Sequence, residues 1–225
     1  MRINKYLALH KYASRREADK LVEAGRVYIN GAQAALGSDV KDGDTVEVTG
    51  EMKTYRYFAY NKPRGIITHS PQGDEQSIED ILPLKDVFPI GRLDKDSYGL
   101  IILTDDGRIT DALLNPKNEH EKQYEVATLD DLPKGFKRDM ERGVNIGDYT
   151  TKPCQVEILG KRSFSITLTE GKKHQIRRMC GAFGASAIEL KRVRILNIAI
   201  GSLRVGSYRP IQDTELATFL KSLGM

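Results

Sequence analysis

The chain has 225 residues, of which 40% are hydrophobic and 29% charged, with a formal net charge of +4. These proportions are ordinary for a folded globular protein and exclude a disordered or collagen-like chain. Two cysteines are too few for a disulfide scaffold and lack the paired spacing of a zinc site, and no apolar run approaches the roughly 18 residues of a membrane span. The first sixteen residues lack the continuous apolar segment of a secretory signal. We therefore expect a cytoplasmic protein of one large or two modest domains.

Basic residues are concentrated at the two ends of the chain. Residues 1–30 contain seven Lys and Arg against three acids, and residues 171–225 contain ten against three. Two basic segments that meet in the fold would form a surface for a polyanion. Two separate solvated helix faces would explain the same charges without any partner.

Two short helices are predicted at the start of the chain. Ser14 and Glu17 have the spacing of a capping box, which predicts that a helix begins there, and Gly25 is placed to end it. Ile3 and Leu7 supply the apolar side of a preceding helix. The pattern predicts a basic helical hairpin.

A small β-unit follows these helices. Val27 and Ile29 alternate with polar residues as in a strand, and Asn30-Gly31 is a strong signal for a two-residue hairpin turn. Residues 45–48 read as a later strand. The first fifty residues therefore combine two helices with a short sheet.

This layout resembles the ribosomal S4-like RNA-binding domain. The residues that carry the resemblance are Arg2 to Leu7, Ser14 to Ala18, and Gly25 to Gly31. The resemblance implies that a basic helical face binds RNA phosphates through Arg2, Lys5, Arg15, Arg16 and Lys20. Such contacts position RNA without reading its sequence. We expect residues 1–50 to form this domain, residues 51–56 a linker, and residues 57–225 a second domain.

The second domain alternates strand and helix patterns. Strands are predicted at residues 99–104, 124–128, 164–168 and 193–195. Apolar residues at helical spacing predict a helix over residues 176–183, which places Cys180 in the core, and Asp213 is placed to cap a final helix. These patterns indicate an α+β arrangement with a substantial sheet.

The segment 88–100 places charged residues between two glycines just before an apolar strand. Loops that lead into a rigid strand often carry catalytic groups, although a surface turn with solvated Asp94 and Asp96 would have the same composition. A two-carboxylate glycosidase is disfavoured, because residues two apart on an extended loop point similarly and cannot flank a sugar from opposite faces.

Gly91-Arg92-Leu93-Asp94 with Ser97, Gly99 and Leu100 resembles the active-site motif of the RsuA/RluB/RluE/RluF-type pseudouridine synthases. Asn61 to Gly65, Lys122 to Val126 and Gly171 to Met179 resemble the family's other motifs, in the same order. With the S4-like segment, the resemblance covers essentially the whole chain. It implies a mixed, mostly antiparallel sheet flanked by helices, and isomerisation of an RNA uridine without a redox step, a metal or another cofactor.

The resemblance also implies roles for individual residues. Asp94 would be the nucleophile, Tyr124 would lie against the uracil, and Arg177 would pair with Asp94, since a nearby guanidinium favours an ionised carboxylate. Arg92 would fill the gap left by the flipped uridine. The alternatives are that Tyr124 is an ordinary strand aromatic, that Arg177 contacts phosphate, and that Arg92 is structural.

Further residues of these motifs are expected to contact the substrate, namely Lys62, His174 and Arg178, although Lys62 and the following Pro63 are expected to act mainly in the architecture. The other histidines, His10, His69 and His120, are scattered along the sequence and do not predict a metal site.

A uridine in ribosomal RNA is the expected substrate. Residues 88–97 and 175–180 look most like the large-subunit RluF type, which favours 23S rRNA, whereas residues 170–175 also resemble small-subunit RsuA-type members. The alternatives are 16S rRNA, tRNA, or a non-catalytic rRNA-binding ribosome assembly factor that kept the fold. Loss of Asp94, Tyr124 or Arg177 would favour the last alternative, and all three are present. A monomer is expected.

Overall fold

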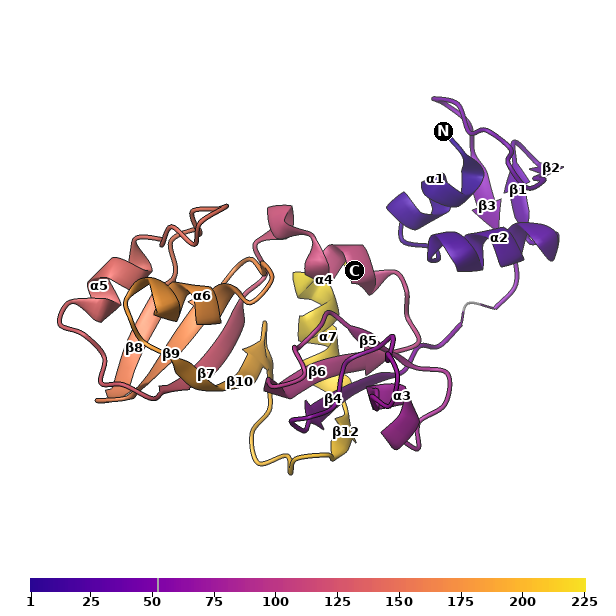
Figure 1. Ribbon diagram of the computed structural model, residues 1–225. Coiled ribbons are helices and arrows are strands. Elements are labelled where there is room, and N and C mark those ends of the chain that lie inside the picture. The colour runs from indigo at the N-terminus through magenta and orange to yellow at the C-terminus, as the bar shows by residue number, and fades with distance from the viewer. Residues whose placement is uncertain (52) are drawn as a thin grey trace.

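The computed structural model describes residues 1–51 and 53–225. Met52, in the expected linker, lies outside the described residues. Figure 1 shows a small N-terminal unit beside a larger unit built on a long sheet.

The small unit contains the two predicted helices and a three-stranded sheet. Helix α1 spans Ile3–Leu9 and α2 spans Arg15–Glu23; strands β1 (Val27–Ile29), β2 (Ala32–Gln33) and β3 (Val46–Val48) pair antiparallel in the order β2-β1-β3. The capping box is confirmed, because the Ser14 hydroxyl accepts from the Glu17 amide and the Glu17 carboxylate accepts from the Ser14 amide. The hairpin turn is also confirmed, with Asn30 at φ 51° and Gly31 at φ 78°.

The larger unit contains nine strands and five α-helices among its described residues. Its strands are β4 (Tyr57–Lys62), β5 (Phe88–Ile90), β6 (Tyr98–Thr104), β7 (Lys122–Thr128), β8 (Gln155–Gly160), β9 (Ser163–Leu168), β10 (Ala187–Ile195), β11 (Ile198–Ala199) and β12 (Tyr208–Pro210). Its helices are α3 (Ile78–Ile81), α4 (Ile109–Leu114), the 3-10 helix η1 (Pro116–Asn118), α5 (Phe136–Glu141), α6 (Gln175–Ala182) and α7 (Asp213–Ser222).

The sheet order is β12-β4-β6-β10-β7-β9-β8, with β5 paired to β6 and β11 to β10. Strands β6 and β10 run parallel, and every other pairing of these strands in the described part of the chain is antiparallel. The expected mixed, mostly antiparallel sheet is therefore confirmed.

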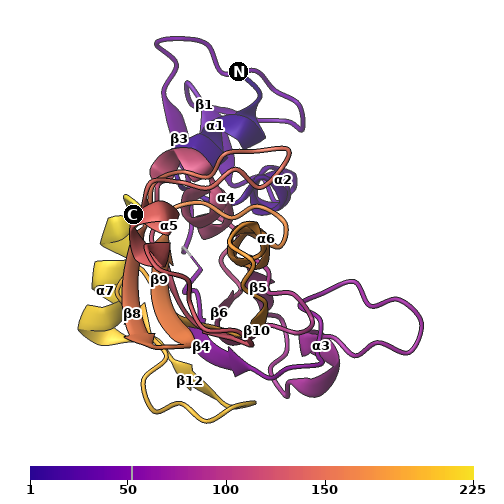
Figure 2. The ribbon, with the colours of Figure 1, turned by 60° about the vertical axis from the view of Figure 1, so that its left-hand side comes forward.

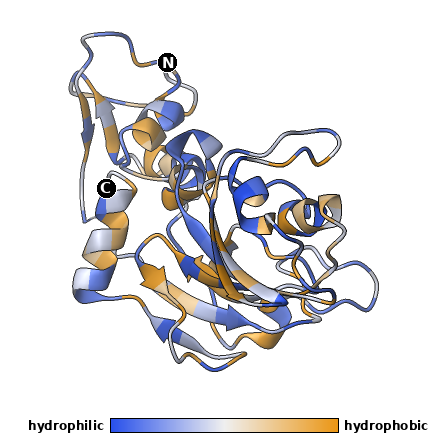
Figure 3. Cartoon of the chain, turned by 90° about the vertical axis from the view of Figure 1, so that its left-hand side faces the viewer, coloured by the Kyte–Doolittle hydropathy of each residue, from blue (hydrophilic) through white to orange (hydrophobic). Residues whose placement is uncertain are grey.

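Strand β6 explains the apolar run before Asp105, because it is buried on both faces. Ile101 and Leu103 point into a core with α5 and α6, whereas Leu100 and Ile102 point into a second core with α4 and α7. Figure 2 shows α6 and α7 on opposite sides of the sheet. Hydrophobic segments recur along the central strands and the helices that cover them (Figure 3).

The beginning of α7 differs from the prediction. Gln212 is the N-cap residue and Asp213 is the first residue of the helix, with no side-chain cap bond. The cap was therefore predicted one residue too late.

Within the described ranges, no helix combines the length and apolar character needed to cross a membrane.

Lys11 joins the two units through the C-terminal end of α7. Its ammonium donates to the Leu223 and Gly224 carbonyls, each at 2.7 Å. The Lys11 carbonyl in turn accepts from Nη1 of Arg108 at 3.2 Å. The last turn of a helix leaves carbonyl groups without intrahelical partners, so a lysine there is favourable.

Candidate active site

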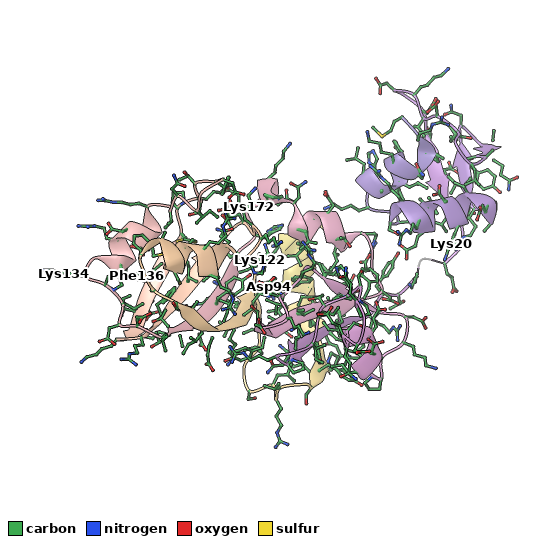
Figure 4. The ribbon with its side chains drawn as sticks, in the orientation of Figure 1. Lys20, Asp94, Lys122, Lys134, Phe136 and Lys172 are labelled. Carbon is green, nitrogen blue, oxygen red and sulfur yellow. The ribbon has the colours of Figure 1, made fainter. Side chains whose placement is uncertain are left out.

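Asp94 lies in the loop between β5 and β6, near the middle of the larger unit (Figure 4). Its side chain is 42% exposed, so the carboxylate is open to a ligand from solvent. The neighbouring Leu93 and Ser97 are buried. The foot of the loop is thus buried, whereas the Asp94 carboxylate is exposed.

Lys62, at the end of β4, holds this loop from beneath. The side chain is fully buried, and its ammonium donates to the carbonyl oxygens of Ser97 at 2.8 Å, Pro63 at 3.0 Å and Asp94 at 3.3 Å. Burial lowers the pKa of Lys62 to about 8, while the negative charges of Asp94 and Asp96 oppose this change. The three acceptors match the three hydrogens of a protonated amine, so the geometry agrees with the architectural role expected for Lys62.

The buried Thr68 side chain fixes Leu93, the residue before Asp94. The Thr68 hydroxyl donates to the Leu93 carbonyl at 2.9 Å and accepts from the Leu93 amide at 3.0 Å. On the other side of Asp94, the Gly65 amide donates to the Lys95 carbonyl at 2.9 Å. The loop is therefore fixed on both sides of the carboxylate.

His174 is the basic residue nearest to the Asp94 carboxylate. Its Nδ1 lies 3.2 Å from Oδ2 of Asp94, and its side chain is 46% exposed. His174 has a left-handed backbone, φ 51°, and immediately precedes α6. The structure thus brings together two residues that are eighty positions apart in the sequence.

Glu170 organises the loop that carries His174. This carboxylate is 4% exposed and accepts from the Tyr149 hydroxyl at 2.7 Å, the Lys152 amide at 2.9 Å and the Gln175 side-chain amide at 2.9 Å. A buried carboxylate is tolerated only when such donors satisfy it. Glu170 therefore ties the start of α6 to the segment that contains Tyr149.

Tyr124 belongs to a row of residues that crosses the sheet. Lys62 pairs with Gly99, Gly99 with Arg192, and Arg192 with Tyr124. Gly99 has φ +106°, and a Cβ atom there would lie 2.3 Å from the Arg192 carbonyl oxygen, so only glycine fits. Tyr124 is 9% exposed. The strand pairing thus connects Tyr124 to Lys62, the residue at the end of β4 that supports the Asp94 loop.

The expected pair between Arg177 and Asp94 is not formed in the structure. Nη1 of Arg177 donates to the Ala187 carbonyl at 2.6 Å, and its Nη2 is buried without a partner in the described part of the chain. Arg177 follows His174 by three residues, so α6 directs it toward the start of β10, whereas His174, in the loop before the helix, reaches the carboxylate.

The other two arginines of the expected site differ in their contacts. Arg178 contacts Asp148 and the Ile146 carbonyl, which ties α6 to the loop before β8. Arg92 is exposed, two residues before Asp94. Arg92 is therefore open to solvent, while the Arg178 guanidinium already has protein partners.

The five basic residues expected to contact RNA phosphates, Arg2, Lys5, Arg15, Arg16 and Lys20, are all exposed. Lys5, Arg15, Arg16 and Lys20 form no ion pair with any described residue, and Arg2 lies 4.0 Å from Asp39. Four cations on α1 and α2 thus have no ion-pair partner among the residues that the structure describes; Lys20 is labelled in Figure 4.

Comparison with known proteins agrees with this architecture. Residues 56–182 match the family described as RNA pseudouridylate synthase, and residues 1–46 match the S4 domain. The chain belongs to the RNA pseudouridine synthase family. Its fold is the pseudouridine synthase fold with an S4 domain, as the sequence motifs implied.

Two curated pseudouridine synthases and one solved structure illustrate the similarity. The chain is 41% identical to the dual-specificity RNA pseudouridine synthase RluF of Escherichia coli (strain K12), over 98% of this chain and 79% of the relative. It is 35% identical to ribosomal large subunit pseudouridine synthase B of Bacillus subtilis (strain 168), over 96% and 93%. A crystal structure of a pseudouridylate synthase superposes with a TM-score of 0.71 at 28% identity, covering 99% of both chains.

The sequence motifs did not identify three buried residues that hold segments of the candidate site in place. Arg192, Glu170 and Thr68 are 4%, 4% and 3% exposed, and each bonds a segment of the site. The only signal for Arg192 is its position two residues after the buried Leu190 on one strand, where alternation predicts an inward side chain. Glu170 and Thr68 have no such signal, because their partners lie on other elements.

Proposed function

We propose that this chain isomerises a uridine of ribosomal RNA to pseudouridine, with Asp94 as the nucleophile. The observation that carries the proposal is an exposed carboxylate beside His174, on a loop fixed by buried groups. A nucleophile must be accessible to the ribose or base, and a fixed loop keeps it in a reactive position.

The reaction balances without an external reagent. The bond between N1 of uracil and C1′ of ribose breaks, and a bond from C5 to C1′ forms. The proton on C5 is lost and N1 gains one, so the product is an isomer of the substrate. Asp94 would hold the detached fragment covalently, while Tyr124 would confine the turning base against its ring.

The basic residues are proposed to hold the RNA. Arg2, Lys5, Arg15, Arg16 and Lys20 would bind backbone phosphates, since these side chains are exposed. Around the flipped uridine the proposed contacts come from Lys62, Arg92, His174 and Arg178, with Lys62 acting through the loop. Arg177 would contribute its unpartnered nitrogen.

The finer assignments follow from the same argument. We propose 23S rRNA as the substrate because both relatives are RNA pseudouridine synthases and one is named for the large subunit. We further propose a monomeric cytoplasmic enzyme divided into residues 1–50, a linker at 51–56, and residues 57–225. Separate hydrophobic clusters in the small and larger units support this division.

Tritium release from uridine labelled at C5 tests the proposal directly. The intact protein, Asp94→Asn and Asp96→Asn are incubated separately with 23S rRNA, 16S rRNA and tRNA transcripts. We expect release from 23S rRNA with the intact protein and Asp96→Asn, and none with Asp94→Asn. Asp96→Asn is the matched control because it removes an exposed carboxylate from the same loop.

The outcomes separate the alternatives. Release from another RNA would replace the proposed substrate but keep the chemistry. Full activity of Asp94→Asn would refute the nucleophile. RNA binding without release from any RNA, including assembling ribosomal particles, would favour the assembly-factor alternative.

A further inference from the structure

Arg192 is a buried cation that no carboxylate neutralises. Its residue is 4% exposed, and it forms no ion pair with any residue that the structure describes. Its Nη2 is buried and has no hydrogen-bond partner among them. Burying a charge is costly unless polar groups compensate it, so the acceptors that Arg192 does contact are informative.

These acceptors are backbone carbonyls on the two sides of Asp94. Nε of Arg192 donates to the Leu100 carbonyl at 2.7 Å, and Nη1 lies 3.5 Å from the Arg92 carbonyl oxygen. Leu100 is on β6, just after the loop, and Arg92 precedes Asp94 by two residues. One guanidinium therefore spans the entry and the exit of the loop that carries the nucleophile.

Arg192 and Lys62 together supply donors for an irregular segment of backbone. Lys62 binds the Asp94 and Ser97 carbonyls, and Arg192 contacts those of Arg92 and Leu100. The Arg92, Asp94 and Ser97 carbonyls lie outside the strands, so they cannot use a strand ladder and need other donors. With these carbonyls turned inward to two cations, the Asp94 side chain remains outside, 42% exposed.

The sheet register places Arg192 between the loop and Tyr124. Arg192 pairs with Gly99 on β6 and with Tyr124 on β7. Displacement of this one side chain would therefore affect both the nucleophile and the tyrosine expected to confine the base. No other described side chain bonds to both ends of the Asp94 loop.

We propose that Arg192 is a positioning residue for the isomerisation, acting through the carbonyl groups of Arg92 and Leu100 to hold Asp94 opposite Tyr124. This inference rests on the proposed role of Asp94. A misplacement of about 1 Å costs roughly 100-fold in rate. The effect is expected on kcat, because Arg192 is buried and takes no part in the RNA surface.

The test compares Arg192→Gln and Arg192→Lys with Arg194→Gln in multiple-turnover tritium release at saturating RNA, with the intact protein and Asp94→Asn in parallel. Arg194 is the matched control, since it lies on the same strand but pairs with Glu121 at 3.0 Å, away from the loop. We expect Arg192→Gln to lower kcat about 100-fold with RNA affinity unchanged. Arg192→Lys should recover part of this loss, and Arg194→Gln should keep the rate of the intact protein.

The pH profile gives a readout that a purely structural role would not change. The charges facing the Lys62 ammonium are Asp94 and Asp96 from the loop and Arg192 from β10, and the Arg192 charge lowers the pKa of Lys62. Arg64 and His174 lie beyond them, against the Asp96 carbonyl and the Asp94 carboxylate. Arg192→Gln should therefore move the alkaline limb of kcat to higher pH, and Arg194→Gln should not.

The remaining outcomes decide against the inference or against the proposed function. Arg192→Gln with intact-protein kcat, while Asp94→Asn is inactive, overturns the inference alone. If Arg192→Gln does not fold, Arg192→Lys decides: a folded, slow enzyme supports positioning, whereas full activity or failure to fold assigns Arg192 to the fold. No release with the intact protein on any RNA contradicts the proposed function instead.

Discussion

Substitution of Lys62 by methionine is expected to damage both stability and rate. Methionine fills a similar volume but leaves the Pro63, Asp94 and Ser97 carbonyls without their donor. Each unsatisfied buried group costs about 1–3 kcal/mol. Against this, the fall of the Lys62 pKa from 10.5 to about 8 indicates that burial of its charge costs about 3 kcal/mol. At the middle of this range the three carbonyls cost about 6 kcal/mol, so we expect a net loss of about 3 kcal/mol in the free energy of unfolding.

Chemical denaturation and tritium release measure the two effects separately. Lys95→Met is the control, because Lys95 is an exposed lysine of the same loop, 3.0 Å from Glu75. Such exposed pairs contribute about 0–1 kcal/mol, so the control should change little. For Lys62→Met we expect kcat to fall by about 100-fold. A denaturation midpoint and kcat equal to those of the control would refute the argument that Lys62 supports the loop.

The lowered pKa of Lys62 leads us to expect opposite effects of pH on stability and on activity. Its pKa and that of Lys122 are lowered to about 8, so between pH 8 and pH 9 the unfolded chain holds more protons than the folded chain. The free energy of unfolding should therefore rise with pH in this window. Above pH 9 burial of Cys154 and Cys180 opposes the rise, because it raises their pKa values to about 11 and about 12, and above pH 10 the raised pKa values of Tyr55 and Tyr60, each about 12, oppose it further.

Activity should fall in the same window, because a neutral Lys62 amine has only two hydrogens for three carbonyls. Paired measurements of unfolding and kcat from pH 7 to pH 9 check this opposition. If stability and kcat rose together, the pH dependence would have to come from groups other than Lys62.

Three further outcomes are expected. Arg15→Ala with Arg16→Ala should weaken RNA binding and reduce the slope of log affinity against log salt by about 0.7–0.9 for each lost phosphate contact, as measured by filter binding at several salt concentrations; an unchanged slope would remove both residues from the RNA surface. Glu170→Ala should lower the free energy of unfolding by about 2–4 kcal/mol, because one buried and two half-buried donors lose their acceptor; a denaturation midpoint like that of the intact protein would contradict this. His174→Ala should lower kcat by no more than about fivefold, since both it and Asp94 are exposed and such pairs are weak; a loss of 100-fold or more would assign His174 a role in proton transfer.

Local patterns predicted the elements that carry the site. The capping box at Ser14, the Asn30-Gly31 turn and the strand before Asp105 depend on neighbours within a few residues, and all three are found in the structure. The position of Asp94 in a loop before a strand could also be predicted, because Gly91 precedes it and Gly99 and the apolar run 100–103 follow it in the sequence.

The partners of these residues could not be predicted in the same way. Asp94 approaches His174 across eighty positions, and whether His174 or Arg177 reaches it depends on where α6 begins. Arg192 contacts Leu100 across ninety-two positions. Such contacts depend on strand order and register, which motif spacing does not contain. The cap of α7 was missed by one residue because neighbouring polar residues offer equivalent caps.

There is a physical reason why the sequence motifs identified the exposed residues of the candidate site more readily than the buried contacts that hold them. A nucleophile has to be exposed, and Asp94 and His174 keep more than two fifths of their side chains open. An exposed side chain on an irregular loop is rigid only if the loop's buried carbonyls are bound by something else. Lys62 and Arg192 meet that need with donors and no acceptors, which turns the carbonyls inward and leaves the carboxylate outward. Two buried cations that form no ion pair with a described residue, which a stability argument alone would disfavour, are thus explained by the accessibility that the proposed reaction requires.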